Sequence, residues 1–320
     1  MTSILSVGSV AYDSVKTPFG EVEEVLGGSA TYFSISASFF SNIDLVACVG
    51  KDFRKQDVEL LESRDINLEG LEYMDGQTFR WKGEYGHDLN EALTLDTQLN
   101  VFADFHPTLS NRHQNARYVF LGNIDPALQH QVLSQVEAPQ LVVCDTMNYW
   151  IEGHWDTLLE TLKLVDILLV NESEAKQLAQ ETNLVKGARK ILTWGPKILV
   201  VKRGEYGVLM FYMDSEETCP DGQLSSETSP VIFGAPAYPL EQVFDPTGAG
   251  DSFAGGFVGY LAGVDRNDVQ ATRQAIIFGS VMASFCVERF SLERLRELTF
   301  TEIEMRYREF REMTYFEDIA

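Results

Sequence analysis

Cysteine, histidine and basic residues are scarce in this sequence of 320 residues, and each shortage argues against a class of protein. The four cysteines lie far apart and form no C-x-x-C pair, so we expect neither a zinc site nor a disulfide framework. The five histidines show no H-E-x-x-H or paired spacing, and we expect surface or structural roles for them. Only 25 Lys and Arg stand against 48 Asp and Glu, a net charge of −23, which disfavours nucleic acid and anionic membranes as partners.

Long hydrophobic runs are also missing. No uninterrupted apolar stretch has the length of a membrane span, and no basic residue precedes Lys16, so the apolar opening Ile4–Val10 has no charged segment before it. We therefore expect a protein of the reducing cytoplasm with no membrane partner. In so acidic a chain, an anionic ligand must be held by a local feature such as backbone amides, a metal ion or a few placed cations.

With 45% hydrophobic and 23% charged residues, the chain has the composition of an ordinary folded protein. Short apolar runs recur along it with the Val and Ile content of strands buried on both faces. These runs are Ile4–Val7, Leu45–Val49, Tyr118–Leu121, Leu141–Cys144, Ile167–Val170 and Ile198–Val201. Helical patterns cover Ser29–Phe40, Glu172–Gln180, Asp251–Ala262 and a tail that begins with a capping box at Thr301-Glu302-Ile303-Glu304. The pattern predicts an α/β fold with a mostly parallel central sheet flanked by helices.

Two segments depart from this alternation and predict antiparallel hairpins in a smaller sheet. The first is Val10–Val25, and the second is Leu71–Tyr85, with turn signals at Asp75-Gly76 and Lys82-Gly83. Asp214–Pro230 is polar and rich in turn residues, so we expect an exposed loop between hairpin strands.

The segment Phe244–Gly256, FDPTGAGDSFAGG, is the most informative. A strand-like run stops at Asp-Pro, and Gly248-Ala249-Gly250 then permit a tight turn before a helix that begins near Asp251. Free amides at a helix N-terminus favour an anion, so the segment predicts a phosphate cradle. Asp251 by itself is also an ordinary helix-capping residue. The P-loop motif, the third glycine of a dinucleotide fingerprint and the protein-kinase motifs are all absent.

FDPTGAGDSFAGGF resembles the C-terminal signature of the ribokinase-like (PfkB) carbohydrate kinases, and further motifs follow the family in order over nearly the whole chain. SVGSVAYD at Ser6–Asp13 and LGGSA at Leu26–Ala30 are similar to its substrate motifs. NESE at Asn171–Glu174 and VKRGEYG at Val201–Gly207 are similar to its N-x-x-E motif and nucleotide-site hairpin. The resemblance implies a single three-layer kinase domain over residues 1–320, with a small β-sheet lid formed by about 10–25 and 71–105.

The resemblance also implies roles for individual residues. Asp251 would be the catalytic base, and the amides of Gly248, Ala249 and Gly250 the anion hole. Asp13, Gly27 and Gly28 would bind the acceptor; Lys202, Gly204, Gly207 and Asn171 would bind ATP; Asn171 and Glu174 would hold Mg²⁺ through water. A monovalent cation such as K⁺ would lie near Asp245 and the Cys286–Phe290 region.

Each of these motifs has a plainer interpretation. Asp13 can merely end a strand, Gly27-Gly28 can form an ordinary turn, and Asn171 is a natural N-cap with Glu174 in the first helical turn. For Gly204 and Gly207 a hairpin turn is the default, and Lys202 can be a solvated lysine at a strand end.

The chain departs from the family pattern at Ser9, where Asn is frequent, and at Tyr32, where related kinases carry an Asn that touches the substrate. We predict an ATP-dependent kinase that phosphorylates a hydroxymethyl group of a small sugar or polyol. A nucleoside acceptor and a non-catalytic ligand-binding regulator remain the alternatives. The aromatic residues of Leu71–Tyr85 can alternatively form a homodimer contact, because lid sheets in the family often do.

Overall fold

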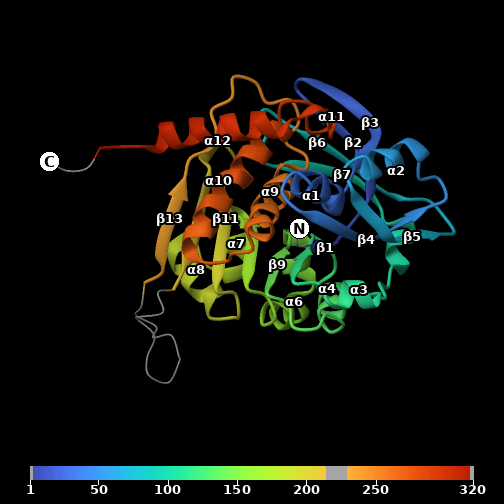
Figure 1. Ribbon diagram of the computed structural model, residues 1–320, viewed down its shortest axis with the longest axis horizontal. Coiled ribbons are helices and arrows are strands. Elements are labelled where there is room, and N and C mark those ends of the chain that lie inside the picture. Colours follow the sequence, from blue (N-terminus) through green and yellow to red (C-terminus); the bar gives the residue numbers. More distant parts are fainter. Residues whose placement is uncertain (1–2, 214–228, 318–320) are drawn as a thin grey trace.

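The computed structural model describes residues 3–213 and 229–317, and its main element is a sheet of nine strands in the order β13-β12-β11-β10-β9-β8-β1-β4-β5 (Figure 1). The strands from β11 to β5 run parallel, whereas β12 and β13 are antiparallel to their neighbours. Their bounds are β1 (Ser3–Val7), β4 (Asn42–Gly50), β5 (Ile66–Met74), β8 (Tyr118–Leu121), β9 (Leu141–Asp145), β10 (Ile167–Asn171), β11 (Ile198–Lys202), β12 (Val208–Tyr212) and β13 (Val231–Ala235). All six predicted strands belong to this sheet, which confirms the α/β fold class.

Helices cover both faces of the sheet. One layer holds α1 (Ser29–Ala37), α9 (Ala249–Val264), α10 (Val269–Cys286), α11 (Glu293–Glu297) and α12 (Phe300–Thr314). The other holds α4 (Pro126–Leu133), α5 (Asn148–Gly153), α6 (Trp155–Leu162), α7 (Glu172–Ala179) and α8 (Leu184–Leu192). The short elements are α2 (Lys55–Glu62), α3 (Asn111–Gln114) and the 3-10 turns η1 (Asn100–Asp104) and η2 (Gly204–Tyr206). No helix within the described residues is long and apolar enough to cross a membrane.

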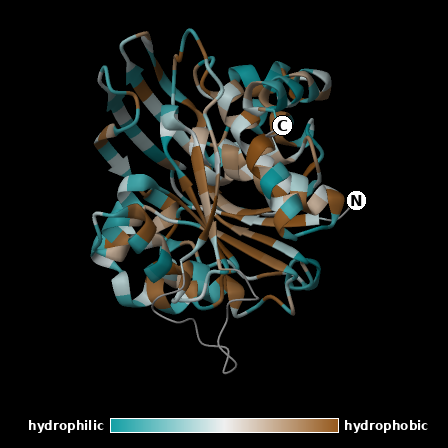
Figure 2. Ribbon diagram, turned by 90° about the vertical axis from the view of Figure 1, so that its left-hand side faces the viewer, coloured by the Kyte–Doolittle hydropathy of each residue, from teal (hydrophilic) through white to brown (hydrophobic). Residues whose placement is uncertain are grey.

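The two faces of the sheet have separate hydrophobic cores. Ile4 of β1 packs into the α1/α9/α10 core, and its neighbour Leu5 packs into the α4/α6/α7/α8 core. Figure 2 shows hydrophobic residues running along the central strands. Because successive side chains of a strand point to opposite faces, strands covered on both sides are apolar throughout, as the sequence runs predicted.

The smaller sheet has four strands in the order β3-β2-β6-β7, namely β2 (Ala11–Thr17), β3 (Gly20–Gly27), β6 (Phe79–Tyr85) and β7 (Ala92–Gln98). The antiparallel pair of β2 and β3 confirms the first predicted hairpin. In Figure 1 these strands lie to one side of the helix layer that contains α1 and α9.

The predicted hairpin over Leu71–Tyr85 is wrong. Leu71 to Met74 complete β5, which pairs with β4 in the large sheet, and Asp75-Gly76 lies in the connection to β6 of the small sheet. Lys82-Gly83 is not a turn, because it lies inside β6 where the pairing with β7 shifts register. Glycine at position 83 leaves room for the Trp81 ring, since a Cβ there would lie 2.1 Å from it. Alternating apolar residues do not reveal which of two sheets a strand joins.

The tail helix α12 is present, but its predicted capping box is displaced. The box is formed by Thr299 and Glu302: the Thr299 N–H donates to Glu302 Oε2 at 2.9 Å, and the Thr299 hydroxyl accepts from the Glu302 N–H. Ile303 and Phe310 are buried, so the predicted amphipathic face is correct. The predicted loop over Asp214–Pro230 lies largely outside the described residues.

Candidate active site

Three polar residues stand at the carboxyl ends of neighbouring parallel strands: Asp145 ends β9, Asn171 ends β10 and Lys202 ends β11. Asn171 and Lys202 are direct partners in the sheet. Helix α9 starts at the same edge, since a Cβ on Gly250 would lie 3.1 Å from Lys202 Nζ. The carboxyl edge of a parallel sheet is the usual place for a ligand in such folds.

The predicted turn before α9 is present. Gly248 is the N-cap of α9 and has φ 75°, and a Cβ there would lie 2.4 Å from the Tyr32 ring, so this position favours glycine for two reasons. The Ala249 N–H donates to the Pro246 carbonyl at 3.1 Å and so serves the turn itself. The amides of Gly248 and Gly250 are therefore the better candidates for the predicted anion hole.

Asp251 lies in the first turn of α9, but Gly248 occupies the N-cap position, so Asp251 is not the capping residue of this helix. The pKa of Asp251 is raised to about 7, chiefly by burial and secondly by the Asp145 charge, with Lys202 opposing both effects. A carboxyl group with a pKa near neutrality is suited to accept a proton from a hydroxyl group.

Lys202 is not a solvated lysine. Its Nζ lies 2.6 Å from Asp145 Oδ2, and the exposed fractions of the two side chains are only 18% and 7%. Burial by itself would lower the pKa of Lys202, but the Asp145, Glu174 and Asp251 carboxylates together raise it, so the ammonium stays charged. The result is one buried cation among three carboxylates beside the start of α9.

Asp145 was missed by the sequence analysis, although a signal for it exists. It follows the apolar run Leu141–Cys144 directly, in the same way that Lys202 follows Ile198–Val201. A charged residue immediately after a buried parallel strand points to the ligand edge of the sheet.

Asn171 and Glu174 form a complete capping box at the start of α7. The Glu174 N–H donates to Asn171 Oδ1 at 2.8 Å, and the Asn171 N–H donates to Glu174 Oε2 at 2.7 Å. Burial raises the pKa of Glu174 to about 7 despite the nearby Lys202 ammonium. The capping interpretation is therefore correct for both side chains, while the second carboxylate oxygen of Glu174 is not used by the cap.

The predicted acceptor residues lie together in the small sheet and at its exit. Asp13 on β2 is 4% exposed, and a Cβ on Gly27 would lie 1.9 Å from its carboxylate. Gly28 has φ 93°, and a Cβ there would lie 2.5 Å from the Ser9 carbonyl oxygen. Burial raises the pKa of Asp13 to about 7, and the Gly28 N–H partly offsets this. The two glycines thus let the chain pass close to a buried carboxylate.

Ser9 and Tyr32, the two departures from the family pattern, have structural contacts. Ser9 Oγ accepts from the Ser29 N–H at 3.0 Å and so holds the start of α1. Tyr32 is buried, with its ring against Gly248, so it supports the turn before α9.

The acceptor residues and the charged cluster are linked along one edge. A Cβ on Gly122 would lie 2.8 Å from Ser29 Oγ. The buried Gln129 amide donates to the Gly122 carbonyl at 2.8 Å and to the Asp145 carbonyl at 3.0 Å, which ties the end of β8 to the end of β9. The Asp251 charge also contributes to the raised pKa of Asp13.

The predicted nucleotide hairpin is the antiparallel pair of β11 and β12, joined through η2. Gly204 and Gly207 have φ 55° and 88°, and the Arg203 N–H donates to the Gly207 carbonyl at 2.8 Å. A Cβ on Gly204 would lie 1.8 Å from Asn90 Oδ1. The loop between β6 and β7 therefore touches this hairpin.

Asp245, the residue near which the resemblance places a monovalent cation, is buried. Its two carboxylate oxygens accept from the Thr247 N–H at 2.9 Å and from the Ser291 N–H at 3.0 Å, and burial raises its pKa. These two hydrogen bonds connect the turn before α9 to the chain that follows α10.

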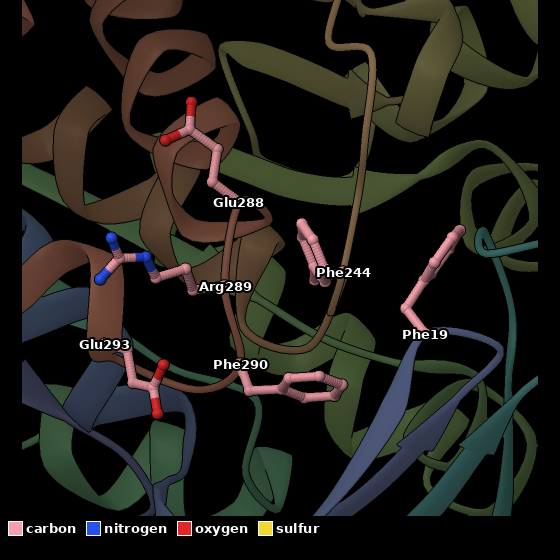
Figure 3. A pocket seen from close by; sticks show the side chains of 6 residues that line it. All are labelled: Phe19, Phe244, Glu288, Arg289, Phe290 and Glu293. Carbon is pink, nitrogen blue, oxygen red and sulfur yellow. The ribbon is translucent and has the colours of Figure 1, made fainter.

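A shallow pocket of about 330 Å³ lies beside this region (Figure 3). Its aromatic side chains are Phe19 from the β2–β3 turn, Phe244 and Phe290, and its charged ones are Glu288, Arg289 and Glu293. The Thr17 hydroxyl donates to the Phe244 carbonyl at 2.9 Å, so the pocket lies where the small sheet meets the segment before Asp245. The carboxylates and the lysine of the cluster described above do not line it.

The fold and the site agree with a family comparison. The model of the pfkB family of carbohydrate kinases matches residues 1–296 of this chain. The chain therefore belongs to the pfkB carbohydrate kinase family.

Two relatives of this chain are kinases named for different acceptors. The chain is 28% identical over 271 residues to the cytidine kinase of Thermococcus kodakarensis, covering 83% of this chain and 90% of that protein. It is 23% identical over 297 residues to the inositol 3-kinase of Arabidopsis thaliana, covering 89% and 74%.

Solved structures share the ribokinase-like fold. The Methanocaldococcus jannaschii nucleoside kinase has a TM-score of 0.72 at 20% identity, covering 97% of this chain and 99% of that one. The Burkholderia thailandensis nucleoside kinase in complex with inosine has a TM-score of 0.71 at 18% identity, with coverages of 96% and 98%. An E. coli protein described as a ribokinase II, in complex with ATP and Mg²⁺, has a TM-score of 0.75 at 16% identity, with coverages of 97% and 100%.

Proposed function

We propose that this protein is an ATP-dependent kinase that phosphorylates the hydroxymethyl group of a nucleoside. The observation that carries the kinase chemistry is the half-buried Asp251 in the first turn of α9, next to the Lys202–Asp145 pair and close enough to Asp13 for its charge to act on that carboxyl group. Membership of the pfkB family supports the reaction class. The nucleoside was the alternative in the sequence analysis, and here it takes the place of the sugar or polyol predicted first, because cytidine and nucleoside kinases are among the relatives.

In the proposed reaction, Asp251 takes the proton of the acceptor hydroxyl group as its oxygen attacks the γ-phosphorus of ATP. The new O–P bond forms, the bond to the β,γ-bridging oxygen breaks, and ADP leaves. The Gly248 and Gly250 amides and the Lys202 ammonium stabilise the negative charge on the phosphoryl oxygens. Asp13 accepts hydrogen bonds from other acceptor hydroxyl groups and fixes the direction of attack.

The charged cluster fits a Mg²⁺–ATP substrate. Within the described residues no group of three or more His, Cys, Asp or Glu side chains is arranged to hold a metal ion alone. Mg²⁺ commonly binds through one or two carboxylates, often through water, together with substrate phosphates. Glu174 and Asn171 would supply that contact, and the ion would neutralise phosphate charge. We include a monovalent cation near Asp245 in this proposal, and comparing rates in K⁺ and in a bulky organic cation tests it.

Changing Glu174 to Gln should raise the Mg²⁺ concentration needed for half-maximal rate. Gln keeps an oxygen that accepts the Asn171 N–H, so the capping box and the thermal stability should be retained, while the charge that attracts the metal is lost. Mg²⁺ titrations of the rate for wild type and variant measure this effect, and excess EDTA should abolish activity in both. An unchanged Mg²⁺ requirement would leave Glu174 with a capping role only.

An aromatic cluster beyond the carboxyl ends of β8 and β9 supports a nucleoside over a simple sugar. Asn123 and Met147 lie two residues beyond the ends of β8 and β9, and the Trp150 indole N–H donates to Asn123 Oδ1 at 2.9 Å. Tyr149 and His154 flank Trp150 with ring centroids 4.8 and 5.1 Å away. Tyr149 is 61% exposed. Aromatic faces stack on nucleobases, and three of the proteins compared above are cytidine or nucleoside kinases by name.

Trp150→Ala should raise the KM for a nucleoside about tenfold and leave the KM for ATP unchanged, because one stacking face is removed from the acceptor side alone. Trp150→Phe keeps an aromatic face, so its KM for the nucleoside should lie between those of Trp150→Ala and wild type. Initial rates of ADP release over a panel of nucleosides, sugars and polyols provide the measurement.

The same panel tests the proposed function itself. Faster turnover of a sugar or polyol than of any nucleoside would show that the acceptor is not a nucleoside. The similarity to an inositol 3-kinase makes a polyol the first alternative. Stabilisation by ATP without turnover of any compound would favour a ligand-binding regulator.

We also propose that the small sheet acts as a lid that excludes water, and that it forms a homodimer contact. Every residue of β7 is exposed, including Leu93 and Leu95, and β7 is an edge strand of its sheet. An exposed apolar edge strand is suited to pair with a second copy. Sedimentation over a range of concentrations tests this. The three cysteines within the described residues are free and buried, which accords with the reducing cytoplasm in which we place the enzyme.

A further inference from the structure

Tyr85, the last residue of β6, links the small sheet to the turn before α9. Thr247 Oγ1 donates to Tyr85 Oη at a distance of 3.4 Å. Thr247 lies between Asp245 and Gly248, so the tyrosine reaches the segment that prepares the anion hole. The distance is long for a bond between two hydroxyl groups, and Tyr85 is the acceptor in it. Its own O–H is therefore available as a donor.

Strand β6 pairs in parallel with β2, and Trp81 lies opposite Asp13. Tyr85 follows Trp81 by four residues and therefore faces the same side of the small sheet as Asp13, which is the acceptor side of the site. Burial raises the pKa of Tyr85 well above its usual value, and the charges of Asp245 and Asp13 raise it further, so the hydroxyl group stays protonated. Asp13 is the carboxylate assigned above to the acceptor, whereas Lys202 and Asp145 form the phosphate side. A protonated phenol beside an acceptor-binding carboxylate complements it, because one donates a hydrogen bond and the other accepts.

The same hairpin also reaches the nucleotide side. The loop after Tyr85 brings Asn90 against Gly204 of the nucleotide hairpin. The β6–β7 hairpin therefore spans both predicted substrates, with Tyr85 at the acceptor end. A residue so placed completes the acceptor site only while the small sheet covers it.

We propose that Tyr85 is an acceptor-binding residue contributed by the small sheet, donating its O–H to the same acceptor hydroxyl group whose proton is directed to Asp13. This inference rests on the proposed function, since it assumes a polyhydroxylated acceptor between Asp13 and Asp251. Tyr85 keeps its weak contact with Thr247, because it is the acceptor there and the donor to the substrate. Binding of the acceptor thereby holds the small sheet closed, which restricts water during phosphoryl transfer.

Tyr85→Phe tests the hydrogen bond with little change in shape. We expect the KM and the dissociation constant of the acceptor to rise about fivefold, with the KM for ATP unchanged within twofold. Tyr85→Ala should in addition raise the ratio of ADP released to acceptor phosphorylated, because water enters the site. Tyr73→Phe, on the 56% exposed Tyr73 of β5, is the matched control and should leave all these values at wild type.

Both substrate affinities are measured by calorimetry as well as by kinetics, and melting temperatures establish that the variants fold. Acceptor affinity unchanged in Tyr85→Phe, or an equal loss for ATP and acceptor, would overturn the assignment. If wild type binds an acceptor without turnover, the proposed kinase function fails while the calorimetry still decides the role of Tyr85. If no compound of the panel binds to wild type, both proposals are wrong.

Discussion

Asp251→Asn should lower kcat by about 10²–10⁴-fold on a confirmed acceptor while the protein stays folded and binds ATP. Asn has nearly the same shape as Asp but cannot take the proton of the attacking hydroxyl group. The substitution should spare the fold, because Gly248 rather than Asp251 is the N-cap of α9. Single-turnover rates separate the chemical step from product release, and an Asn variant with wild-type kcat would remove the base from the mechanism.

The pH dependence gives the same residue a second test. Burial raises the pKa of Asp251 to about 7, so kcat/KM should rise with pH as the proton leaves, between about pH 6 and 8. Asp13 also has a pKa of about 7, which should make the rise steeper than a single titration. In Asp251→Asn the residual kcat/KM should rise less steeply with pH, because Asp251 no longer titrates.

The stability of the fold should respond in the opposite direction. A carboxyl group whose pKa is raised in the folded state contributes stability that is complete below its unfolded pKa of about 4, and this contribution is lost as the pH rises through about 7. Asp251→Asn removes the carboxylate that is ionised in both the folded and the unfolded state at pH 8, whereas at about pH 4 and below the group is largely protonated in both states. Its melting temperature should therefore exceed that of wild type by a few degrees at pH 8, and the difference should shrink as the pH falls and vanish below about pH 4. A variant that is equally destabilised at both ends of this pH range would show that the side chain packs differently.

Lys202→Met should lower kcat/KM for ATP at least about 100-fold and also destabilise the protein. The ammonium is the cation that faces Asp145, Glu174 and Asp251, and its loss removes charge stabilisation from the phosphoryl group. It also leaves the 7% exposed Asp145 side chain without its partner, and breaking a buried ion pair in this way typically costs about 3 kcal/mol of unfolding free energy.

The double variant Lys202→Met/Asp145→Asn separates these two effects. It removes both charges of the pair, so the free energy of unfolding measured in urea should recover toward wild type. Activity should stay low, because no cation is restored. If the double variant recovers activity together with stability, Lys202 has a structural role alone. An unchanged kcat and KM for ATP in the single variant Lys202→Met would lead to the same conclusion.

The sequence was most informative where the relevant structure is local. The apolar runs, the Gly248-Ala249-Gly250 turn and the start of α9 depend on residues close together in the chain, and all of them are present in the structure. The hairpin of β2 and β3 is local in the same sense. Steric freedom at glycine and the side-chain period of strands act over a few residues, so these features are legible without the fold.

The partners of these local features depend on the tertiary structure. The sequence determined an α/β fold, a turn suited to a phosphate and an aspartate beside it. It left open whether Lys202 is solvated, omitted Asp145, assigned Leu71–Met74 to the wrong sheet and set the capping box at Thr301 instead of Thr299. Lys202 and Asp145 are 57 residues apart and meet only because β9 and β11 end at one edge of the sheet. The burial that raises the pKa of Asp251 and Asp13, and the carboxylates that keep Lys202 charged, both arise from the packing of the whole chain, so only the tertiary structure decided these charge states.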